Sequence, residues 1–315
     1  MAEYNHSVYR GLIIQGCLKE AMAYCGRFPQ HQELLEKYEA RFQQEKYLSY
    51  AVCPKLNQLL LAYQKYCRDV FYLEQAPEKA AAALGQRLAG LLGLDESLSM
   101  EDLEEKEAAK AFAAEGFHFL GGKTSGYYGP YIWKTEELKR YAVQLPEGEQ
   151  EYPVKFLDGF VFQGWMDYIS FGIVRTGGWS NGDGLIHCVK PAYNLESESF
   201  QVSLLKHEAQ HAADLARYPD MSNEDLEYRA KLVELVYSKE RDLLTPFAQQ
   251  AGDKNKANGH ARAAARIAAG MERLLGRKRG SFPALPHEEV MAAAGTLFAE
   301  SCGEMAEKYG QEDTI

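Results

Sequence analysis

The sequence predicts a mainly helical α+β protein, with an N-terminal helical region followed by a larger region that combines helices with a small β-sheet. Three observations support this prediction. Apolar residues recur with helical spacing over residues 3–115, glycines and aromatic residues cluster over residues 116–198, and helical spacing returns from residue 199. A chain of 315 residues is long enough for about two domains. We therefore predict one domain over residues 1–115 and a second over residues 116–315.

The N-terminal region is predicted to be helical from one apolar face and from its helix breakers. The clearest face follows the i, i+3, i+4, i+7 spacing and consists of Leu56, Leu59, Leu60, Tyr63, Tyr66, Cys67, Val70 and Phe71. Prolines 29, 54 and 77 interrupt the helical pattern. Ser99, followed three residues later by Asp102, predicts the cap of another helix. Several antiparallel helices should result.

The middle of the chain carries the strand signals. Residues 152–156 and 185–189 are short apolar runs typical of strands. The aromatic residues of segment 127–133 are expected to pack in a core, because this role is commoner for such residues than lining a pocket. The glycine-rich stretch 175–184 lacks the Lys-Ser/Thr pair of a phosphate-binding loop, so we interpret it as a loop at the rim of a site.

Charge and composition exclude several classes of protein. Lys and Arg total 35 against 45 for Asp and Glu, and a net charge of -10 argues against nucleic acid or an anionic membrane as a partner. No stretch approaches the roughly 20 apolar residues of a transmembrane helix, and no export signal is visible. The 6 cysteines form no CxxC pair, which argues against a disulfide framework. We expect a cytoplasmic protein with free thiols.

One segment carries a recognisable chemical motif. Residues 207–211 read His-Glu-Ala-Gln-His, an HExxH pattern, on a helix predicted to end near Pro219. Residues four apart share a helical face, so His207 and His211 can reach one metal ion with Glu208 beside them. The motif lies in the apolar stripe of its helix, where a bound cation would offset the cost of burying these groups. The alternative is a pair of core histidines bonded to backbone carbonyls, with Glu208 in a salt bridge.

Helix geometry predicts a third ligand. A second helix should begin near residue 222 and return antiparallel to the first. At 1.5 Å per residue, Glu227 lies nearly level with His211, whereas Glu224 falls short and Glu234 overshoots. Glu227 is therefore the preferred carboxylate. The alternative for Glu227 is an ordinary i, i+4 ion pair with Lys231.

Together these residues resemble the gluzincin branch of the zincin metallopeptidases. The resemblance covers about 25 residues, from the HExxH motif to residues 227–230, which read Glu-Tyr-Arg-Ala and match an ExxA pattern. It implies a zincin-like unit in the C-terminal region, one zinc ion bound by His207, His211 and Glu227, and Glu208 as general base. Lys231 departs from the pattern, because some gluzincins carry an aspartate there, and the spacing is short for the thermolysin-like group.

The resemblance also implies that residues 184–189 form an edge strand above the motif helix, beside which an extended peptide could add. Asp214, one turn beyond His211, is a candidate hydrogen-bond partner for a ligand imidazole. A residue that stabilises the oxyanion is required as well, and the sequence does not select it. The candidates are Tyr193, Tyr228, His118, His187 and His260.

The expected activity is hydrolysis of a peptide or protein substrate through a zinc-bound water activated by Glu208. Two alternatives remain open. One is a catalytically silent zincin-like module that binds metal for sensing or interaction and does not need Glu208 as a base. The other is a metal-free helical interaction protein in which the motif is accidental. The sequence predicts neither the cleavage specificity nor the oligomeric state.

Overall fold

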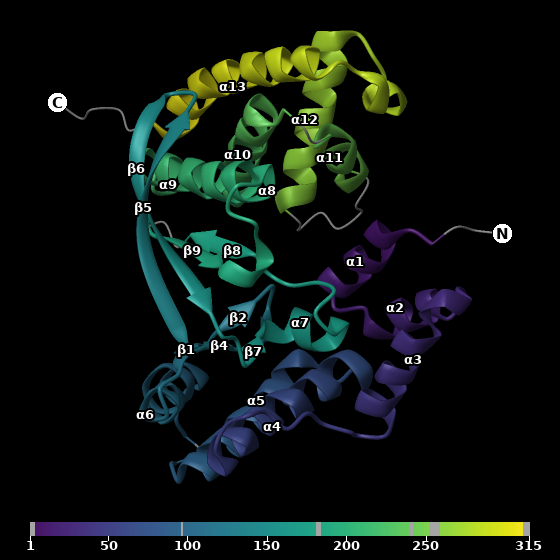
Figure 1. The fold of residues 1–315 in the computed structure, drawn as a ribbon, viewed down its shortest axis with the longest axis vertical. Helices are drawn as coiled ribbons and strands as arrows, with labels where there is room; N and C mark the ends of the chain where they lie inside the picture. Colours follow the sequence, from purple (N-terminus) through teal and green to yellow (C-terminus); the bar gives the residue numbers. More distant parts are fainter. Residues whose placement is uncertain (1–3, 96, 181–183, 240–241, 252–258, 311–315) are drawn as a thin grey trace. The chain divides into compact units, whose positions relative to one another are not determined.

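The computed structural model describes residues 4–95, 97–180, 184–239, 242–251 and 259–310 (Figure 1). Most of the regular structure is helical and the strands form small sheets, which confirms the predicted mixed α+β class with helix dominant. The chain forms two compact units. The first contains Met1–Thr135 and Leu157–Thr176, and the second contains Glu136–Phe156 and Gly177–Ile315.

The predicted boundary at residue 115 coincides with the end of the N-terminal helices but not with the division between the units. The last helix of that region ends at Ala114. The first unit nevertheless continues, because Ile132, Phe162 and Trp165 from the following segments are part of the same buried core as the helices. The hydrophobic core of the first unit therefore extends past the point where the N-terminal helices end and the strands begin.

The α-helices of the first unit are α1 His6–Ile14, α2 Leu18–Cys25, α3 Gln32–Tyr38, α4 Pro54–Cys67, α5 Pro77–Leu92, α6 Ala109–Ala114 and α7 Gly164–Ser170. The 3-10 helix η1 Pro29–His31 and the π-helices η2 Glu39–Gln43, η3 Arg68–Tyr72 and η4 Asp102–Ala108 accompany them. The three prolines start η1, α4 and α5, where a missing N–H leaves no helical bond unmade. The Asp102 N–H donates to the Ser99 hydroxyl at 3.1 Å, which confirms that cap.

The core of the first unit confirms the predicted apolar face. All of the residues predicted for that face, from Leu56 to Phe71, are buried. Around them lie a three-stranded antiparallel sheet in the order β1-β4-β7 and a two-stranded hairpin. The strands are β1 His118–Leu120, β2 Lys123–Thr124, β3 Tyr127–Tyr128, β4 Tyr131–Trp133 and β7 Phe162–Gln163. Tyr131 and Trp133 are buried, and Tyr127 and Tyr128 pack against the core, as predicted for the aromatic cluster.

The second unit contains a four-stranded sheet in the order β5-β6-β9-β8. Its strands are β5 Thr135–Leu145, β6 Gly148–Asp158, β8 Gly178–Ser180 and β9 Ile186–Val189. The predicted strand 152–156 falls within β6, and the predicted strand 185–189 corresponds to β9, which begins one residue later. The prediction that residues 184–189 form the edge strand is wrong, because β9 lies between β6 and β8. The glycine-rich stretch before β9 is itself a strand in part, and β8 pairs with β9 antiparallel.

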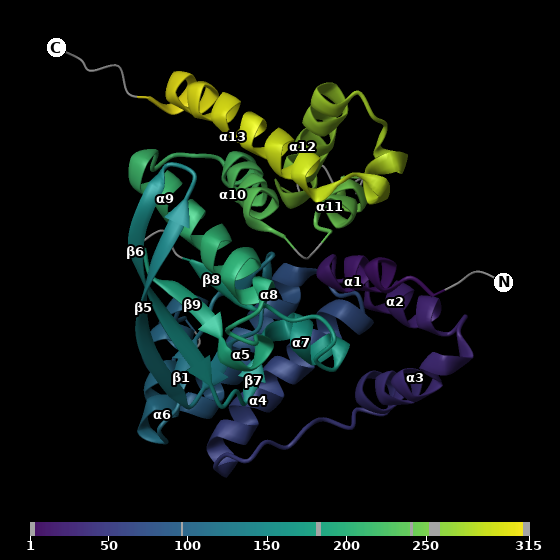
Figure 2. The same cartoon turned by 45° about the horizontal axis from the view of Figure 1, so that its top comes forward.

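The helices of the second unit pack around α10. They are α8 Glu198–Phe200, α9 His207–Arg217, α10 Asn223–Tyr237, α11 Leu244–Gln250, α12 Gly259–Leu275 and α13 His287–Tyr309, with the turns η5 Lys190–Ala192, η6 Gln201–Lys206 and η7 Arg279–Ala284. Helix α10 contacts α9, α12 and α13 (Figure 2). The predicted breaks at Pro219 and over residues 280–286 are confirmed, and the one over residues 252–258 lies outside the described residues.

Two further predictions concern the whole sequence. Every one of the 6 cysteines is a free thiol, three of them buried and three partly buried. In the part of the chain that the structure describes, no helix has the length and apolar character to cross a membrane.

Candidate metal centre

The HExxH motif lies on a helix that faces the core of the second unit. Helical backbone runs without interruption through α8, η6 and α9, and the π-helical turn η6 ends directly before His207. Gly178 of β8 passes this helix closely, since a Cβ there would lie 2.5 Å from a Leu204 methyl carbon and 2.5 Å from the His187 carbonyl oxygen. Only glycine fits such an approach. The glycine-rich stretch therefore allows the sheet edge to pack against the motif helix.

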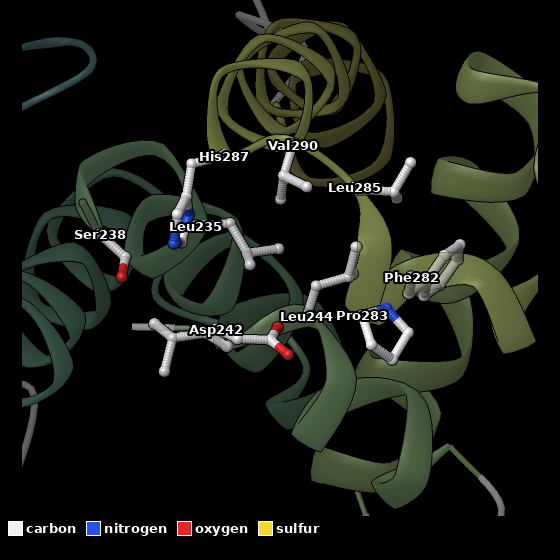
Figure 3. Close-up of a pocket in the computed structure, with 10 residues that line it drawn as sticks. Leu235, Ser238, Asp242, Leu244, Phe282, Pro283, Leu285, His287 and Val290 are labelled. Atoms are coloured by element: carbon white, nitrogen blue, oxygen red, sulfur yellow. The ribbon is translucent and has the colours of Figure 1, made fainter. Parts of the chain in front are cut away.

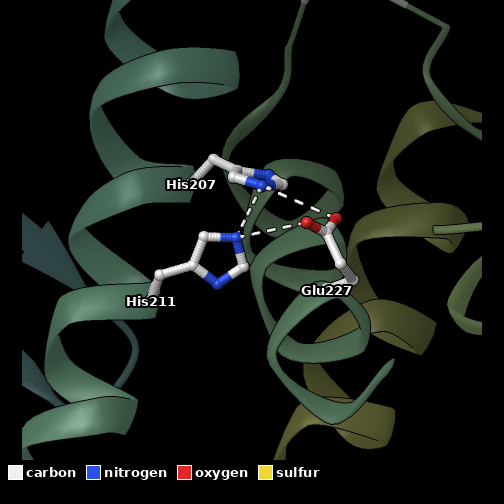
Figure 4. Close-up of side chains that lie close together, drawn as sticks. All are labelled: His207, His211 and Glu227. Atoms are coloured by element: carbon white, nitrogen blue, oxygen red, sulfur yellow. Dashed lines mark hydrogen bonds and ion pairs between the residues drawn. The ribbon is translucent and has the colours of Figure 1, made fainter. Parts of the chain in front are cut away.

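The return helix brings the predicted carboxylate to the motif. Helix α10 begins after Ser222, whose hydroxyl accepts a hydrogen bond from the Asp225 N–H at 3.3 Å and so caps it. Glu227 then lies opposite His211, as the antiparallel geometry predicts (Figure 4). His207, His211 and Glu227 together form a group that could hold a metal ion, with a ligand atom of each within 4.8 Å of the others.

The distances within this group match those between ligands of one small cation. His207 Nε2 lies 3.0 Å from His211 Nε2, while Glu227 Oε2 lies 3.7 Å from the first nitrogen and Glu227 Oε1 lies 3.5 Å from the second. Ligands at 2.0–2.1 Å from a tetrahedral zinc ion are about 3.3 Å apart. The two imidazole planes are nearly perpendicular, at 89°. Both Nε2 atoms lie within 4 Å of an oxygen of the Glu227 carboxylate.

Three histidines and a lysine surround the buried Glu227 carboxylate. Burial alone would raise the pKa of Glu227, but bonding to His211 and His260 and the electrostatic interaction with His207 hold this pKa far below its usual range. Nδ1 of His260, a half-exposed side chain on α12, lies 2.6 Å from Glu227 Oε2. The alternative partner, Lys231, is present too, with its Nζ 3.9 Å from the same oxygen. Glu227 therefore faces the histidines and its helical neighbour at once.

A second carboxylate orients one of the imidazoles. The Glu234 carboxylate lies 2.7 Å from His207 Nδ1. Burial lowers the pKa of His207, but the bond to Glu234 and the charges of Glu234 and Glu227 outweigh burial and raise it. With a proton on Nδ1, His207 presents the lone pair of Nε2 to the group. Nδ1 of His211, by contrast, is buried without a hydrogen-bond partner among the described residues.

Helix geometry predicts that Glu234 lies too far along α10 to be a metal ligand, and its orienting role was not predicted. The sequence nevertheless carries a signal for this role. Glu234 follows Glu227 by seven residues, which is about two helical turns, so both carboxylates share one face of α10. Because α9 and α10 run antiparallel, Glu234, which follows Glu227 along α10, lies opposite His207, which precedes His211 along α9.

The prediction that Asp214 bonds a ligand imidazole is wrong. Both carboxylate oxygens of Asp214 lie 2.9 Å from Arg229 Nε, and the Gln210 amide donates to the same carboxylate at 2.9 Å. The Arg229 guanidinium also donates to Glu147 at 2.6 Å and to the Ser301 hydroxyl at 2.8 Å. A buried guanidinium attracts this carboxylate more strongly than a neutral imidazole would. Asp214 thus ties α9 to α10 beside the candidate site.

Glu208 occupies a different environment. Its side chain is half-buried, and it makes no hydrogen bond or ion pair with the other described residues. Its charge contributes to raising the pKa of His207, so it lies near the group. A carboxylate in this state can accept a proton from a bound molecule.

Of the candidates for oxyanion stabilisation, the structure brings His260 to the group. Tyr228 is buried in the core, with the Arg266 guanidinium 3.8 Å from its ring centre. His187 stacks on Trp179 with ring centres 5.0 Å apart, and Tyr193 packs edge-on against Phe200. His118 belongs to the first unit.

A cavity of about 180 Å³ lies elsewhere in the second unit (Figure 3). Residues from the end of α10, from α11 and from the start of α13 line it, with Asp242 and His287 among apolar side chains. None of the three residues of the metal-binding group lines this cavity.

No protein-family model, no curated protein and no solved structure matches this chain. The chemistry of the site is therefore inferred from the residues of this chain: two imidazole nitrogens and one carboxylate, buried, at the mutual distances of ligands that share one metal ion.

Proposed function

We propose that this protein is a zinc-dependent peptidase in which His207, His211 and Glu227 hold the ion and Glu208 is the general base. The observation that carries the proposal is the spacing of the three ligand atoms, at 3.0, 3.5 and 3.7 Å, next to a carboxylate without a partner among the described residues. Two imidazoles and one carboxylate are the ligand set of catalytic zinc sites, which keep a fourth position open.

Each residue has a defined task in this proposal. When bound, zinc would polarise a substrate carbonyl and lower the pKa of a coordinated water to about 7. Glu208 accepts the proton of the attacking water and then delivers it to the nitrogen of the departing amine. Glu234 keeps the His207 proton on Nδ1 and so leaves Nε2 free for the ion.

The first experiment measures the metal. Protein purified without added metal or chelating resin is analysed by elemental mass spectrometry, as wild type and as His211→Ala. We expect near one zinc per wild-type chain and almost none in the variant, because two remaining ligands bind weakly. A peptide library is then screened for cleavage, with Glu208→Gln as the blank. Wild type that binds no metal, even after zinc is added back, contradicts the proposal.

One observation favours a catalytically silent metal-binding module instead. The His260 imidazole already contacts Glu227, and a fourth nitrogen ligand would close the site to water, as in structural zinc sites. The two functions differ in the behaviour of His260→Ala. A closed site loses much of its zinc affinity in this variant, whereas an open peptidase site retains its zinc and changes only in turnover.

A further inference from the structure

A second cavity lies within the first unit, and nothing in the proposed function uses it. Its volume is about 360 Å³, within the usual range of roughly 300–1,000 Å³ for small-molecule sites. The end of α3, the turn η2 and the segment around α7 line it. Part of its wall is aromatic, and three charged side chains also line it: Lys37, Arg41 and Asp167.

Arg41 is the unusual member of this lining. The residue is only 8% exposed, and burial lowers the pKa of its guanidinium. One terminal nitrogen donates to the Tyr168 backbone carbonyl. No carboxylate of the described residues lies within ion-pair distance of Arg41, and the Nε and the other terminal nitrogen donate to none of their atoms. A buried guanidinium is normally paired with an anion.

Aromatic rings hold this guanidinium in place. Its central carbon lies 3.9 Å from the ring centre of Phe171 and 4.6 Å from that of Tyr168. Phe171 has a left-handed backbone conformation, with φ of 57°, at the C-terminal cap of α7, and Gly172 follows with φ of 81°. The two rings therefore hold the guanidinium in position, and its Nε and second terminal nitrogen have no acceptor among the described residues.

The lining charges limit the ligand further. Lys37 lies one helical turn before Arg41, is exposed, and pairs with Glu33 at 2.7 Å. Asp167 also lines the cavity, and its charge interacts with that of Arg41. With Lys37 paired to Glu33, the Arg41 guanidinium is the one cation of these three side chains that offers unused donors to an anion. A single guanidinium favours a singly charged anion over a phosphate or a polyanion. The aromatic walls favour an apolar body attached to that anion.

We propose that this cavity binds a small organic monocarboxylate with an apolar or aromatic body, its carboxylate paired with the free edge of the Arg41 guanidinium. Two parallel N–H donors match the two oxygens of a carboxylate, and the match supplies both affinity and orientation. The site is separate in residues and in chemistry from the metal centre. It would give the first unit a ligand-binding role of its own.

The test uses calorimetric titration of the full chain with 3-phenylpropionate and with its neutral amide. We expect saturable binding of the acid and about tenfold weaker binding of the amide, because the amide cannot form a charged pair. Arg41→Gln should weaken binding of the acid by about tenfold or more. Arg27→Gln, at an exposed arginine of the same unit that does not line the cavity, should bind like wild type.

Two further variants keep the test decisive if Arg41→Gln fails to fold. Arg41→Lys retains the charge but loses the planar pair of donors, so the acid should bind several-fold more weakly. Lys37→Gln removes an exposed positive charge together with its ion pair to Glu33, and should weaken binding by about two- to threefold. The proposal is overturned if wild type shows no saturable binding at millimolar acid, if the amide binds as well as the acid, or if both Arg41 variants bind like wild type.

Discussion

Among the described residues, each unit of this protein buries one arginine against a phenylalanine ring, and the two arginines differ in what surrounds their charge. Arg229 of the second unit lies 4.3 Å from the Phe298 ring centre and is bonded to the carboxylates of Asp214 and Glu147. Arg41 of the first unit lies 3.9 Å from Phe171 and has no carboxylate among the described residues within ion-pair distance. The charge of Arg229 holds helices together, whereas we propose that the charge of Arg41 is available to a ligand.

The largest expected effect comes from removing the paired charge. Arg229→Met leaves the Asp214 carboxylate buried without its counter-ion, so we expect a loss of about 3–5 kcal/mol in the free energy of unfolding. Arg41→Met leaves only a backbone carbonyl without a donor and should cost about 1 kcal/mol. Urea unfolding of both variants measures the difference. Equal losses would mean that Arg41 has an anionic partner in the folded protein.

The stability of the first unit should also depend on pH, because it buries the carboxyl group of Glu104. Burial raises the pKa of Glu104 in the first unit to about 7, although hydrogen bonds from the Gly122 N–H and the Tyr63 hydroxyl oppose this shift. The folded protein therefore retains a proton that the unfolded chain loses near its ordinary pKa of 4.5. Stability should fall as the pH rises from about 4.5 to 7, by about 3 kcal/mol.

The variant Glu104→Gln removes the titrating group and can keep one acceptor and one donor in place. We expect its unfolding free energy to vary less over the same pH range than that of wild type, measured by urea unfolding at each pH. Glu115→Gln, at an exposed glutamate of the same unit, serves as the control and should retain the wild-type slope. A Glu104→Gln slope equal to that of wild type would disprove the assignment of this proton to Glu104.

A smaller effect is expected at the metal centre, where His207 has an orienting carboxylate and His211 Nδ1 has no such partner among the described residues. Glu234→Gln should reduce zinc affinity by about 10- to 100-fold, because the amide holds His207 less firmly in the required tautomer. Competition with a chromophoric chelator measures the affinity. Glu224→Gln, which alters a carboxylate of the same helix outside the group, should leave it unchanged. Identical losses in both variants would argue for a general effect on α10.

The smallest effect concerns the helix caps that the two units share. Ser99 and Ser222 each accept a hydrogen bond from the N–H three residues later and donate to the side chain of that aspartate. Replacement of either serine by alanine should cost about 1 kcal/mol of stability. Only Ser222→Ala should also weaken zinc binding, since α10 carries Glu227. Thermal unfolding and chelator competition distinguish the two outcomes.

Much of the local structure was predictable because it depends on neighbours in the chain. The prolines that start helices, the Ser99 cap and the apolar face of residues 56–71 all follow from spacing within a few turns. The three residues of the metal-binding group were predictable for the same reason. Two lie four apart on one helix, and a short connection to an antiparallel helix sets the third.

The incorrect predictions share a different cause. Residues 184–189 were expected at a sheet edge, but pairing with β8 places β9 inside the sheet. Asp214 was expected beside an imidazole, but Arg229 from another helix takes both of its oxygens. Arg229 lies on a different helix from Asp214, and β8 lies within the glycine-rich stretch that was interpreted as a loop. In both cases another segment takes the hydrogen-bonding groups, and the sequence pattern did not indicate this pairing.

The sequence by itself determined the helical regions, the HExxH motif and the carboxylate level with it, because helix geometry converts residue number directly into position. Only the tertiary structure decided that Glu234 orients His207, that Arg229 is neutralised and that Arg41 is not. The cost of burying a charge depends on which groups surround it in three dimensions, and those groups come from segments that the chain brings together only when it folds.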